Sequence, residues 1–399
     1  MGVLDRIAPA WSSLRRFNAV PNDQRAFVFY AESRADWAHL GPIVEELIGR
    51  HGRTVCYVTS EEHDPIFQRA DSKLLTFYVG MGSTRTTFFR LVDARVVVMT
   101  LPDLETFHLK RSVHPVHYAY VFHSMVSTHM IYRPGAFDAY DTVFCVGPHH
   151  VAEIRRTESL DGLPPKHLVE HGYGRLDAIL AERTDPGTAI DAVGADGPTR
   201  RRVLLAPSWG PGSFIESPVG AELVDRLLTA DQDVVLRLHP MTVRHHPDLV
   251  DELNGRFGAR GLTIETDMRD RRSLAASDIM VSDWSGAALE YAFGLERPVL
   301  FLDMPRKVNN PEYERLGIVP IEDSIRTEVG ELVRPDDLDA VMPAIERLCL
   351  RRGEVQARLR EARERNVYNV GRSATVGAEH LVRLADGPAD PIPHERMRD

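Results

Sequence analysis

Cysteine is scarce in this chain of 399 residues. The three that occur, Cys56, Cys145 and Cys349, are widely spaced and odd in number. They offer neither a disulfide framework nor a Cys-x-x-Cys metal motif, which is typical of proteins in a reducing cytoplasm. A His-Glu-x-x-His motif is also missing, and the side chains of adjacent pairs such as His149 and His150 point to different sides. We therefore expect no metal and no other cofactor.

Long apolar runs and an excess of positive charge are missing too. No apolar segment reaches the roughly 18–20 residues that cross a bilayer, and residues 1–17 lack the continuous apolar core of a signal peptide. Lysine and arginine number 48 against 58 aspartates and glutamates, a net charge of −10. Such a chain is a poor candidate for a general nucleic-acid binder. We expect a cytoplasmic protein that binds no nucleic acid and is either soluble or peripheral on the inner face of the cell membrane.

The composition is otherwise that of a globular protein, and its first residues predict an amphipathic helix. With 43% hydrophobic and 27% charged residues, a disordered chain is excluded. The apolar residues of segment 1–22 recur at three- and four-residue steps and share one helical face: Val3, Leu4, Ile7, Trp11, Leu14 and Phe17. This basic, tryptophan-bearing helix would suit a membrane interface. The alternative is a helix packed on the protein's own surface, and Pro9 weakens both interpretations.

The following segment predicts a parallel sheet. Short continuous apolar strands alternate with helical stretches, a pattern typical of a parallel sheet covered on both faces. The predicted strands are 26–31, 54–59, 74–79, 95–99, 118–122 and 142–146, with helices near 37–47 and 84–91. We assign residues 23–185 to a first Rossmann-like domain.

The same pattern restarts after a break at 182–202, which is rich in glycine and proline and predicts a linker. Strands are predicted at 203–206, 234–238, 262–264, 279–282 and 299–302, with helices near 222–230, 249–257 and 287–293. We assign 200–345 to a second Rossmann-like domain, 346–386 to C-terminal helices and 387–399 to a loose tail. The expected fold is therefore α/β, with two parallel sheets that face a central cleft.

Ligands of such sheets bind beyond the carboxyl ends of the strands. The most informative segment there is Ser282-Asp283-Trp284-Ser285-Gly286, which turns from a strand into a helix. Free N–H groups and the helix dipole favour an anion at such a start. Ser285 can cap the helix or donate to a phosphate, and Gly286 lets a ligand approach closely. Asp283 would orient a neighbour or bind a hydroxyl. A capped helix without a ligand is the alternative.

Two other strand ends carry polar side chains. Arg237 and His239 stand two residues apart and so on one strand face. A guanidinium and an imidazole together suit a diphosphate, although a surface ion pair and a loop-capping histidine would explain them as well. Ser208 and Trp209 lie in a loop of glycines and serines, 206–213, that either approaches a nucleotide or is an ordinary connection.

A candidate general base follows the predicted strand 118–122. The imidazole of His123 titrates near pH 6.5 and can accept a proton from a substrate hydroxyl. The alternative is a hydrogen-bonded structural histidine, and each of the 17 histidines carries less weight for their number.

In combination, these segments resemble the CDP-glycerol glycerophosphotransferases of teichoic-acid and capsule synthesis. That family's pattern runs from a His-Gly through Gly-x-Pro/Gly-Arg-x-Asp, Ala-Pro-Thr-Trp, Arg-x-His-Pro and Ser/Thr-Asp-Tyr-Ser-Ser to Arg/Lys-Pro. The matching segments keep this order over residues 120–303: His123, Gly172–Asp177, Ala206–Trp209, Arg237–Pro240, Ser282–Ser285 and Arg297–Pro298. The chain departs from the pattern at Ser124, where the family has glycine, and at Gly286, where it has the second serine.

The resemblance implies a GT-B fold and a transferase of cell-surface polysaccharide synthesis. It would move glycerol phosphate, or a related alditol phosphate, from a CDP-activated donor such as CDP-glycerol to a lipid-linked saccharide or polymer hydroxyl at the membrane surface, releasing CMP. His123 would deprotonate the acceptor hydroxyl, and His239 would hold the diphosphate together with Arg237. The donor would contact Ser208, Trp209, Arg237, Ser282, Asp283, Ser285, Gly286 and, near the ribose, Glu290.

Two alternatives remain open on the sequence. One is a GT-B glycosyltransferase that uses a UDP- or GDP-sugar, since it would share the fold and the phosphate turn. The other is a non-catalytic nucleotide-binding scaffold subunit of a polysaccharide assembly, which the unusual segment after His123 would fit.

Overall fold

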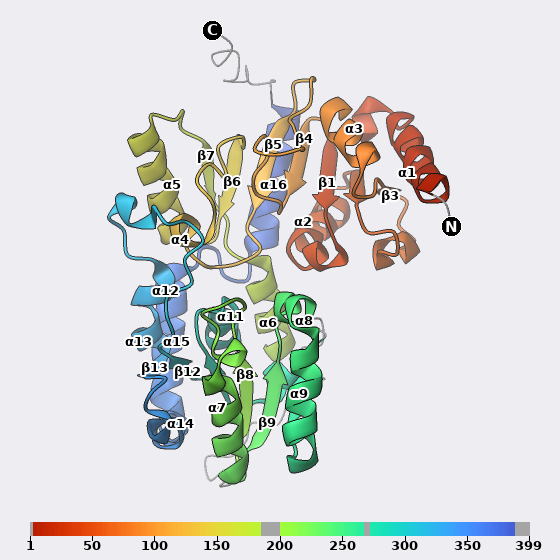
Figure 1. Cartoon of the computed structure of the whole chain (residues 1–399). Helices are drawn as coiled ribbons and strands as arrows, with labels where there is room; N and C mark the ends of the chain where they lie inside the picture. The colour runs from red at the N-terminus through yellow and green to blue at the C-terminus, as the bar shows by residue number, and fades with distance from the viewer. Residues whose placement is uncertain (1–2, 185–199, 267–271, 388–399) are drawn as a thin grey trace.

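The computed structural model describes residues 3–184, 200–266 and 272–387. The chain forms two lobes, each built on one parallel sheet, and the carboxyl ends of the two sheets face each other (Figure 1). We call the body around strands β1–β7 the N-terminal lobe and the body around β8–β13 the C-terminal lobe. The predicted linker is described only in part, because α6 runs to Thr184 and residues 185–199 lie outside the described ranges, as does the tail beyond 387.

The N-terminal sheet has the order β3-β2-β1-β4-β5-β6-β7 with every pair parallel. Its strands are β1 Phe27–Ala31, β2 Val55–Thr59, β3 Leu74–Tyr78, β4 Val96–Met99, β5 His117–Val121, β6 Thr142–Cys145 and β7 His167–Glu170. Valine and aromatic residues fill the central strands, and β1, β2 and β4 are buried along their whole length. Such residues fit a sheet that is covered on both faces.

The C-terminal sheet has the order β10-β9-β8-β11-β12-β13 and is also parallel throughout. Its strands are β8 Arg202–Ala206, β9 Asp233–Arg237, β10 Thr263–Glu265, β11 Ile279–Ser282, β12 Val299–Leu302 and β13 Gly330–Val333. The strand order reverses between β8 and β11, and ligands of doubly wound sheets bind at such a point. The predicted strands are confirmed, while β7 and β13 were not predicted.

Helices surround both sheets. Their bounds are α1 Val3–Asn18, α2 Trp37–Gly49, α3 Ser83–Leu91, α4 Thr128–Ile131, α5 Pro148–Asp161, α6 Gly174–Thr184, α7 Pro218–Thr229, α8 Pro240–His245, α9 Pro247–Phe257, α10 Arg272–Ala276, α11 Ala287–Leu295, α12 Ile321–Ser324, α13 Arg326–Val329, α14 Val341–Leu350, α15 Arg352–Asn366 and α16 Ser373–Asp386. No helix within the described ranges is both long and apolar enough to span a membrane.

The predicted N-terminal helix forms, and the apolar side chains of its second half are turned toward the protein. Leu14 and Phe17 are buried, and the Phe17 ring meets Phe77 edge to face at 5.4 Å and Phe88 at 5.3 Å. This part of α1 therefore packs on β3 and α3, which is the arrangement that the sequence left as the alternative to a membrane-contact helix.

The last helix returns to the N-terminal lobe. Helix α16 packs along α2, and its Ala378 and Leu381 share a buried cluster with Ile43 of that helix (Figure 1). The C-terminal end of the described chain thus completes the core of the first lobe.

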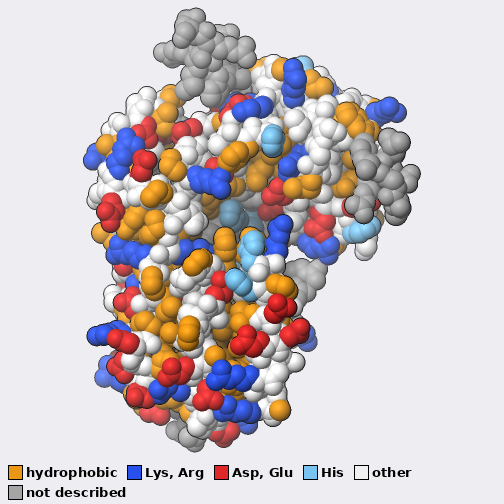
Figure 2. Space-filling model, viewed as in Figure 1, with side chains coloured by type: hydrophobic (Ala, Val, Ile, Leu, Met, Phe, Trp, Pro, Cys, Tyr) orange, Lys and Arg blue, Asp and Glu red, His pale blue; other side chains and the backbone are white. Residues whose placement is uncertain are grey.

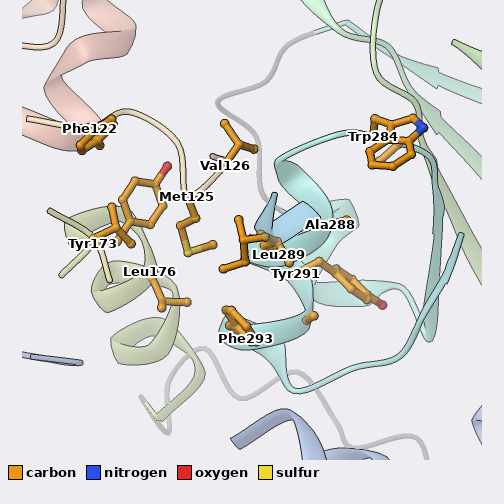
Figure 3. Packing of buried hydrophobic residues seen from close by; sticks show 14 of the residues in the cluster. Phe122, Met125, Val126, Tyr173, Leu176, Trp284, Ala288, Leu289, Tyr291 and Phe293 are labelled. Carbon is orange, nitrogen blue, oxygen red and sulfur yellow. The ribbon is translucent and has the colours of Figure 1, made fainter. Parts of the chain in front are cut away.

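Buried apolar side chains also join the lobes directly. One hydrophobic cluster contains residues of both sheets. In Figure 3, Met125 and Leu176 of the N-terminal lobe point toward Leu289 and Phe293 of α11 in the C-terminal lobe. The loop after β5 and the helix after β11 are therefore held against each other by packing.

Candidate active site

Two buried polar side chains, those of Ser282 and Asp283, connect the turn after β11 to the loop after β8 by hydrogen bonds. The Asp283 carboxylate accepts the backbone N–H groups of Ser208 at 2.7 Å and Phe214 at 3.2 Å, and burial raises its pKa. The Ser282 hydroxyl donates to the Ala206 carbonyl at 2.7 Å. Their polar atoms fix the loop after β8 beside the start of α11, and Ser208 itself is buried in this framework. Asp283 thus orients neighbours, as the sequence allowed, and the predicted donor contacts of Ser282, Asp283 and Ser208 stay predictions.

The start of α11 stays partly open. Ser285 and Gly286 are half-buried, and the Ser285 hydroxyl lies 3.4 Å from the Ala287 N–H that it caps. Gly286 is the residue that precedes the helix and provides no side-chain cap. Because the first N–H groups of a helix lack partners within it, this turn can receive an anion.

His239 caps α8 and presents one nitrogen outward. Its Nδ1 accepts the Met241 N–H at 3.1 Å, so the proton of the neutral ring is on Nε2. The ring stacks on Trp209 with centroids 5.9 Å apart. Burial, and then the charge of Lys307, lower the pKa of His239 to about 4. At neutral pH it is an uncharged hydrogen-bond donor.

Lys307 supplies the positive charge of this cluster. Its Nζ lies 4.1 Å from the centroid of the Trp209 ring, in the segment that follows β12. Burial lowers the pKa of Lys307 to about 8, although the charges of Asp283 and Glu216 oppose that change. Our sequence interpretation missed this residue because it belongs to none of the motifs. The only signal was a basic side chain soon after a predicted strand.

Arg237 lies at the end of its strand, as predicted, and is engaged by the protein. Its side chain is 2% exposed, and its Nη1 lies 3.0 Å from Glu265 and 3.3 Å from the Ser273 hydroxyl. It is the last residue of β9 and pairs in register with Glu265 of β10, which places the guanidinium against the edge strand. Arg237 therefore holds β10, and its contact with the donor stays a prediction.

Glu290 is likewise engaged by the protein. Its carboxylate accepts the Tyr173 hydroxyl at 2.8 Å and the Arg175 Nε–H at 2.8 Å, and Glu290 in turn raises the pKa of Arg175. The Tyr173 hydroxyl also lies 2.9 Å from the His123 carbonyl. Glu290 and the Gly172–Asp177 motif thus link the two lobes, while a contact of Glu290 with the ribose stays a prediction.

His123 lies two residues after the end of β5, at the start of the following loop. Its side chain is exposed to solvent, yet the His39 and Tyr132 rings flank it at 6.3 Å and 6.0 Å between centroids. This crowding lowers the pKa of His123, while the carboxylate of Asp36 opposes the change. The ring is therefore largely neutral at neutral pH, the form that a general base requires. Figure 2 shows histidine side chains around the hollow between the two lobes.

The base loop and the phosphate turn meet across the lobes. Here the base loop means residues 123–127 and the phosphate turn residues 282–286. A Cβ atom at Gly286 would lie 2.8 Å from the Ser124 hydroxyl, so the two segments are in contact. Glu322 of α12 also accepts the Ser127 N–H at 3.0 Å and the Ser127 hydroxyl at 3.1 Å. The fold therefore brings the residue after His123 into contact with the phosphate turn, and a shared role of His123, Ser285 and Gly286 stays a prediction.

Comparison with known proteins shows which family part of this chain is similar to. Residues 160–309 match the family described as CDP-glycerol:poly(glycerophosphate) glycerophosphotransferase. The chain is a glycerophosphotransferase-like enzyme. The matched part of this enzyme contains His239, the phosphate turn and Lys307, whereas His123 lies before it. A search of curated proteins finds no match to the sequence.

Solved structures share the enzyme's fold at low sequence identity. The wall teichoic acid polymerase TagF, a histidine-to-asparagine variant soaked with CDPG, aligns with a TM-score of 0.57 and 12% identity over 96% of this chain and 98% of its own. MnaA of S. aureus with UDP gives 0.57 and 15% over 90% and 95%. The UDP-GlcNAc 2-epimerase of Neisseria meningitidis with UDP-GlcNAc gives 0.54 and 14% over 90% and 99%. The α/β, GT-B-like fold with two sheets around a cleft is thus confirmed.

Within the described ranges, no group of three or more histidine, cysteine, aspartate or glutamate side chains is arranged to hold a metal ion. Lys307 lies close enough to the phosphate turn to feel the charge of Asp283, and it connects the turn with the Trp209 and His239 pair.

Proposed function

We propose that the enzyme transfers glycerol phosphate, or a related alditol phosphate, from a CDP-activated donor to a hydroxyl of a lipid-linked saccharide or polymer, with release of CMP. The observation that carries this proposal is the contact between the base loop and the phosphate turn inside a glycerophosphotransferase-like chain. This contact supports a site in which the imidazole of His123 and the anion-binding helix start act on one donor, the pair of groups that the transfer needs.

The chemistry follows from the charges of the named groups. The acceptor hydroxyl forms a bond to the phosphorus that carries the alditol, while the bond from that phosphorus to the bridging oxygen breaks and CMP leaves. His123 takes the hydroxyl proton. Lys307, the Nε2–H of His239 and the amides that begin α11 stabilise the negative charge on the diphosphate oxygens. In this proposal the donor packs against the ring of Trp209, which stacks on His239.

We also propose that the enzyme is cytoplasmic and meets its acceptor at the inner membrane surface. Because Leu14 and Phe17 of α1 are buried, contact with anionic lipid would use its exposed basic residues Arg15 and Arg16. Replacing both arginines by glutamate should reduce co-sedimentation with anionic vesicles. Unchanged co-sedimentation would assign the membrane contact to another surface.

The donor is tested by offering the purified enzyme CDP-glycerol, CDP-ribitol, UDP-sugars and GDP-sugars and measuring the nucleotide released. CMP release from a CDP-alditol in the presence of an acceptor is the expected result. The GT-B glycosyltransferase alternative predicts UDP or GDP release and no binding of CDP-glycerol in calorimetry. The scaffold alternative predicts that no donor is turned over.

The role of the base is tested by His123→Ala and His123→Gln. Both should lower kcat by about 100-fold or more, the usual contribution of a general base, and leave the donor KM within about threefold, since the ring faces the acceptor. An equal rate for the wild type and both variants would remove His123 from the mechanism.

A further inference from the structure

The base loop places a hydroxyl group where the phosphate turn lacks a side chain. Gly286 has no Cβ, and one built there would meet the Ser124 Oγ at 2.8 Å and a methyl carbon of Val126 at 3.3 Å. The space beside the first turn of α11 is therefore filled from the opposite lobe, by Ser124.

The Ser124 hydroxyl is only weakly engaged within the protein. Its oxygen lies 3.5 Å from the Val126 N–H, at the outer limit of a hydrogen bond. The side chain is half-buried, and among the atoms outside the turn itself its oxygen lies nearest to a Cβ built at residue 286. A hydroxyl at this place can donate to an anion held by the start of α11, because its proton has no other assigned acceptor within the described residues.

A second observation points to an anion at the same place. Arg326 is 5% exposed, and its Nε and Nη1 have no hydrogen-bond partner within the described part of the chain. Its Nη2 pairs with Asp303 at 3.0 Å, and the guanidinium lies 3.8 Å from the centre of the Trp284 ring. Arg326 lines one narrow cavity with Ser285 and Gly286. Two buried N–H donors without acceptors are costly, and a negatively charged oxygen would satisfy them.

Two acidic residues, Asp283 and Glu322, line the same cavity, and the Asp283 carboxylate is engaged by backbone N–H groups. One oxygen of Glu322 accepts hydrogen bonds from Ser127, while the other is buried and has no hydrogen-bond partner within the described ranges. Burial raises the pKa of Glu322 to about 7. This group is therefore partly protonated at neutral pH, and its protonated form can coexist with a phosphate beside Arg326.

We propose that Ser124 contacts the donor phosphate and takes the place of the serine that the phosphate turn lacks at position 286. The inference rests on the proposed function, because it assumes a nucleoside diphosphate donor. It also explains the two departures from the family pattern as one exchange: the hydroxyl has moved from the turn to the base loop. Since Ser124 follows His123 directly, a phosphate bound by Ser124 would also fix the position of the base.

The test returns the serine hydroxyl from position 124 to position 286. Ser124→Gly removes it and should weaken binding of CDP-glycerol and of CDP about 10- to 100-fold in calorimetry, the range for a hydrogen bond to a charged group. The double variant Ser124→Gly with Gly286→Ser should recover most of that affinity. Its matched control, Ser124→Gly with Gly286→Ala, fills the same space without a hydroxyl and should remain weak.

The single variant Gly286→Ser completes the cycle. Its Cβ collides with the Ser124 hydroxyl, so it should lose activity that Ser124→Gly restores, giving a strong coupling between the two sites. Wild-type affinity in Ser124→Gly, or equal recovery by the serine and alanine double variants, would overturn the proposal. Failure of the proposed function looks different: the wild type would bind CDP, and lose affinity in Ser124→Gly, yet release no CMP from CDP-glycerol.

Discussion

Charge at the phosphate turn depends on where each basic side chain is buried. Lys307 faces Trp209 and His239 from the segment after β12, and burial lowers its pKa to about 8. His239 is neutral near pH 7, and Arg237 is engaged with Glu265. Lys307 therefore carries the positive charge that this cluster offers to a diphosphate. The side chain loses that charge as the pH rises through about 8.

This charge predicts a bell-shaped dependence of donor kcat/KM on pH. On the acid side, kcat/KM should fall with a midpoint below pH 6.5, because the pKa of His123 is lowered from its usual value and the base must be neutral. The alkaline limb falls near pH 8, where Lys307 loses its proton as the pH rises through its pKa. In Lys307→Arg the alkaline limb should move upward, since a guanidinium stays protonated. Rates of CMP release from pH 5 to 10 provide the measurement, and an unmoved alkaline limb would argue against Lys307.

Replacement of Arg237 should change stability rather than donor binding. Arg237→Ala leaves the Glu265 carboxylate without its partner, and because that group is partly exposed we expect a loss of about 1–3 kcal/mol, less than for a fully buried pair. Urea unfolding measures this loss. The donor KM of the folded variant should stay within about twofold of wild type, whereas Lys307→Met should raise it about tenfold or more. A large rise in KM for Arg237→Ala alone would restore the interpretation made from the sequence.

Among the elements, the turn from β7 to α6 joins the N-terminal lobe to the C-terminal helices. Gly172 there has a φ of +100°, and a Cβ would lie 2.3 Å from the Tyr368 carbonyl oxygen. Asp177, five residues on, accepts the N–H groups of Gly371 at 2.6 Å and Ser373 at 3.0 Å. The Gly172–Asp177 motif is thus explained by backbone approach and by Glu290, not by direct contact with a donor.

This geometry predicts a marked cost for Gly172→Ala. Both the left-handed backbone and the collision oppose a side chain, so we expect a loss of at least about 2–3 kcal/mol. Gly162→Ala is the matched control: φ is +64° at the end of α5, but no atom lies within 4 Å of a Cβ there. It should cost only about 1 kcal/mol. Thermal unfolding of both variants gives the comparison, and equal losses would contradict the role of the Tyr368 contact.

The elements that sequence reasoning missed share a physical cause. Strand β7 has exposed His167 and Glu170 at its ends, and β13 begins with Gly330 and Glu331, so neither shows a continuous apolar run. Helix α5 buries polar residues in place of apolar ones. Apolar periodicity therefore found the central strands and the edge strands β3 and β10, and it failed at the edge strands β7 and β13, which have polar or glycine residues.

In the whole molecule, the N-terminal lobe is not formed by a continuous part of the chain. Helix α16 supplies Ala378 and Leu381 to the core of the N-terminal lobe, and Glu322 and Glu290 of the C-terminal lobe hold its loops. The base loop is consequently positioned by residues about 170–200 positions further along the chain.

We expect the N-terminal lobe to need α16 to fold. A fragment of residues 1–184 should aggregate, because the α2 face around Ile43 and Leu47 is left open. The same fragment joined by a flexible linker to residues 367–387 should be soluble and unfold cooperatively. Size-exclusion chromatography and thermal melts distinguish the two. Cooperative unfolding of the shorter fragment at the same temperature would show that α16 is dispensable.

The sequence by itself determined the two α/β halves, most strands and the position of the candidate residues at strand ends, because buried parallel strands require continuous apolar runs and leave polar residues to the turns. It also determined the resemblance to glycerophosphotransferases, since those motifs are local. Only the tertiary structure decided which polar atoms are engaged: Arg237 and Glu290 are paired within the protein, and Lys307 and Ser124 are brought to the phosphate turn. The reason is that hydrogen-bond partners and burial come from segments far apart in the chain, which no local pattern specifies.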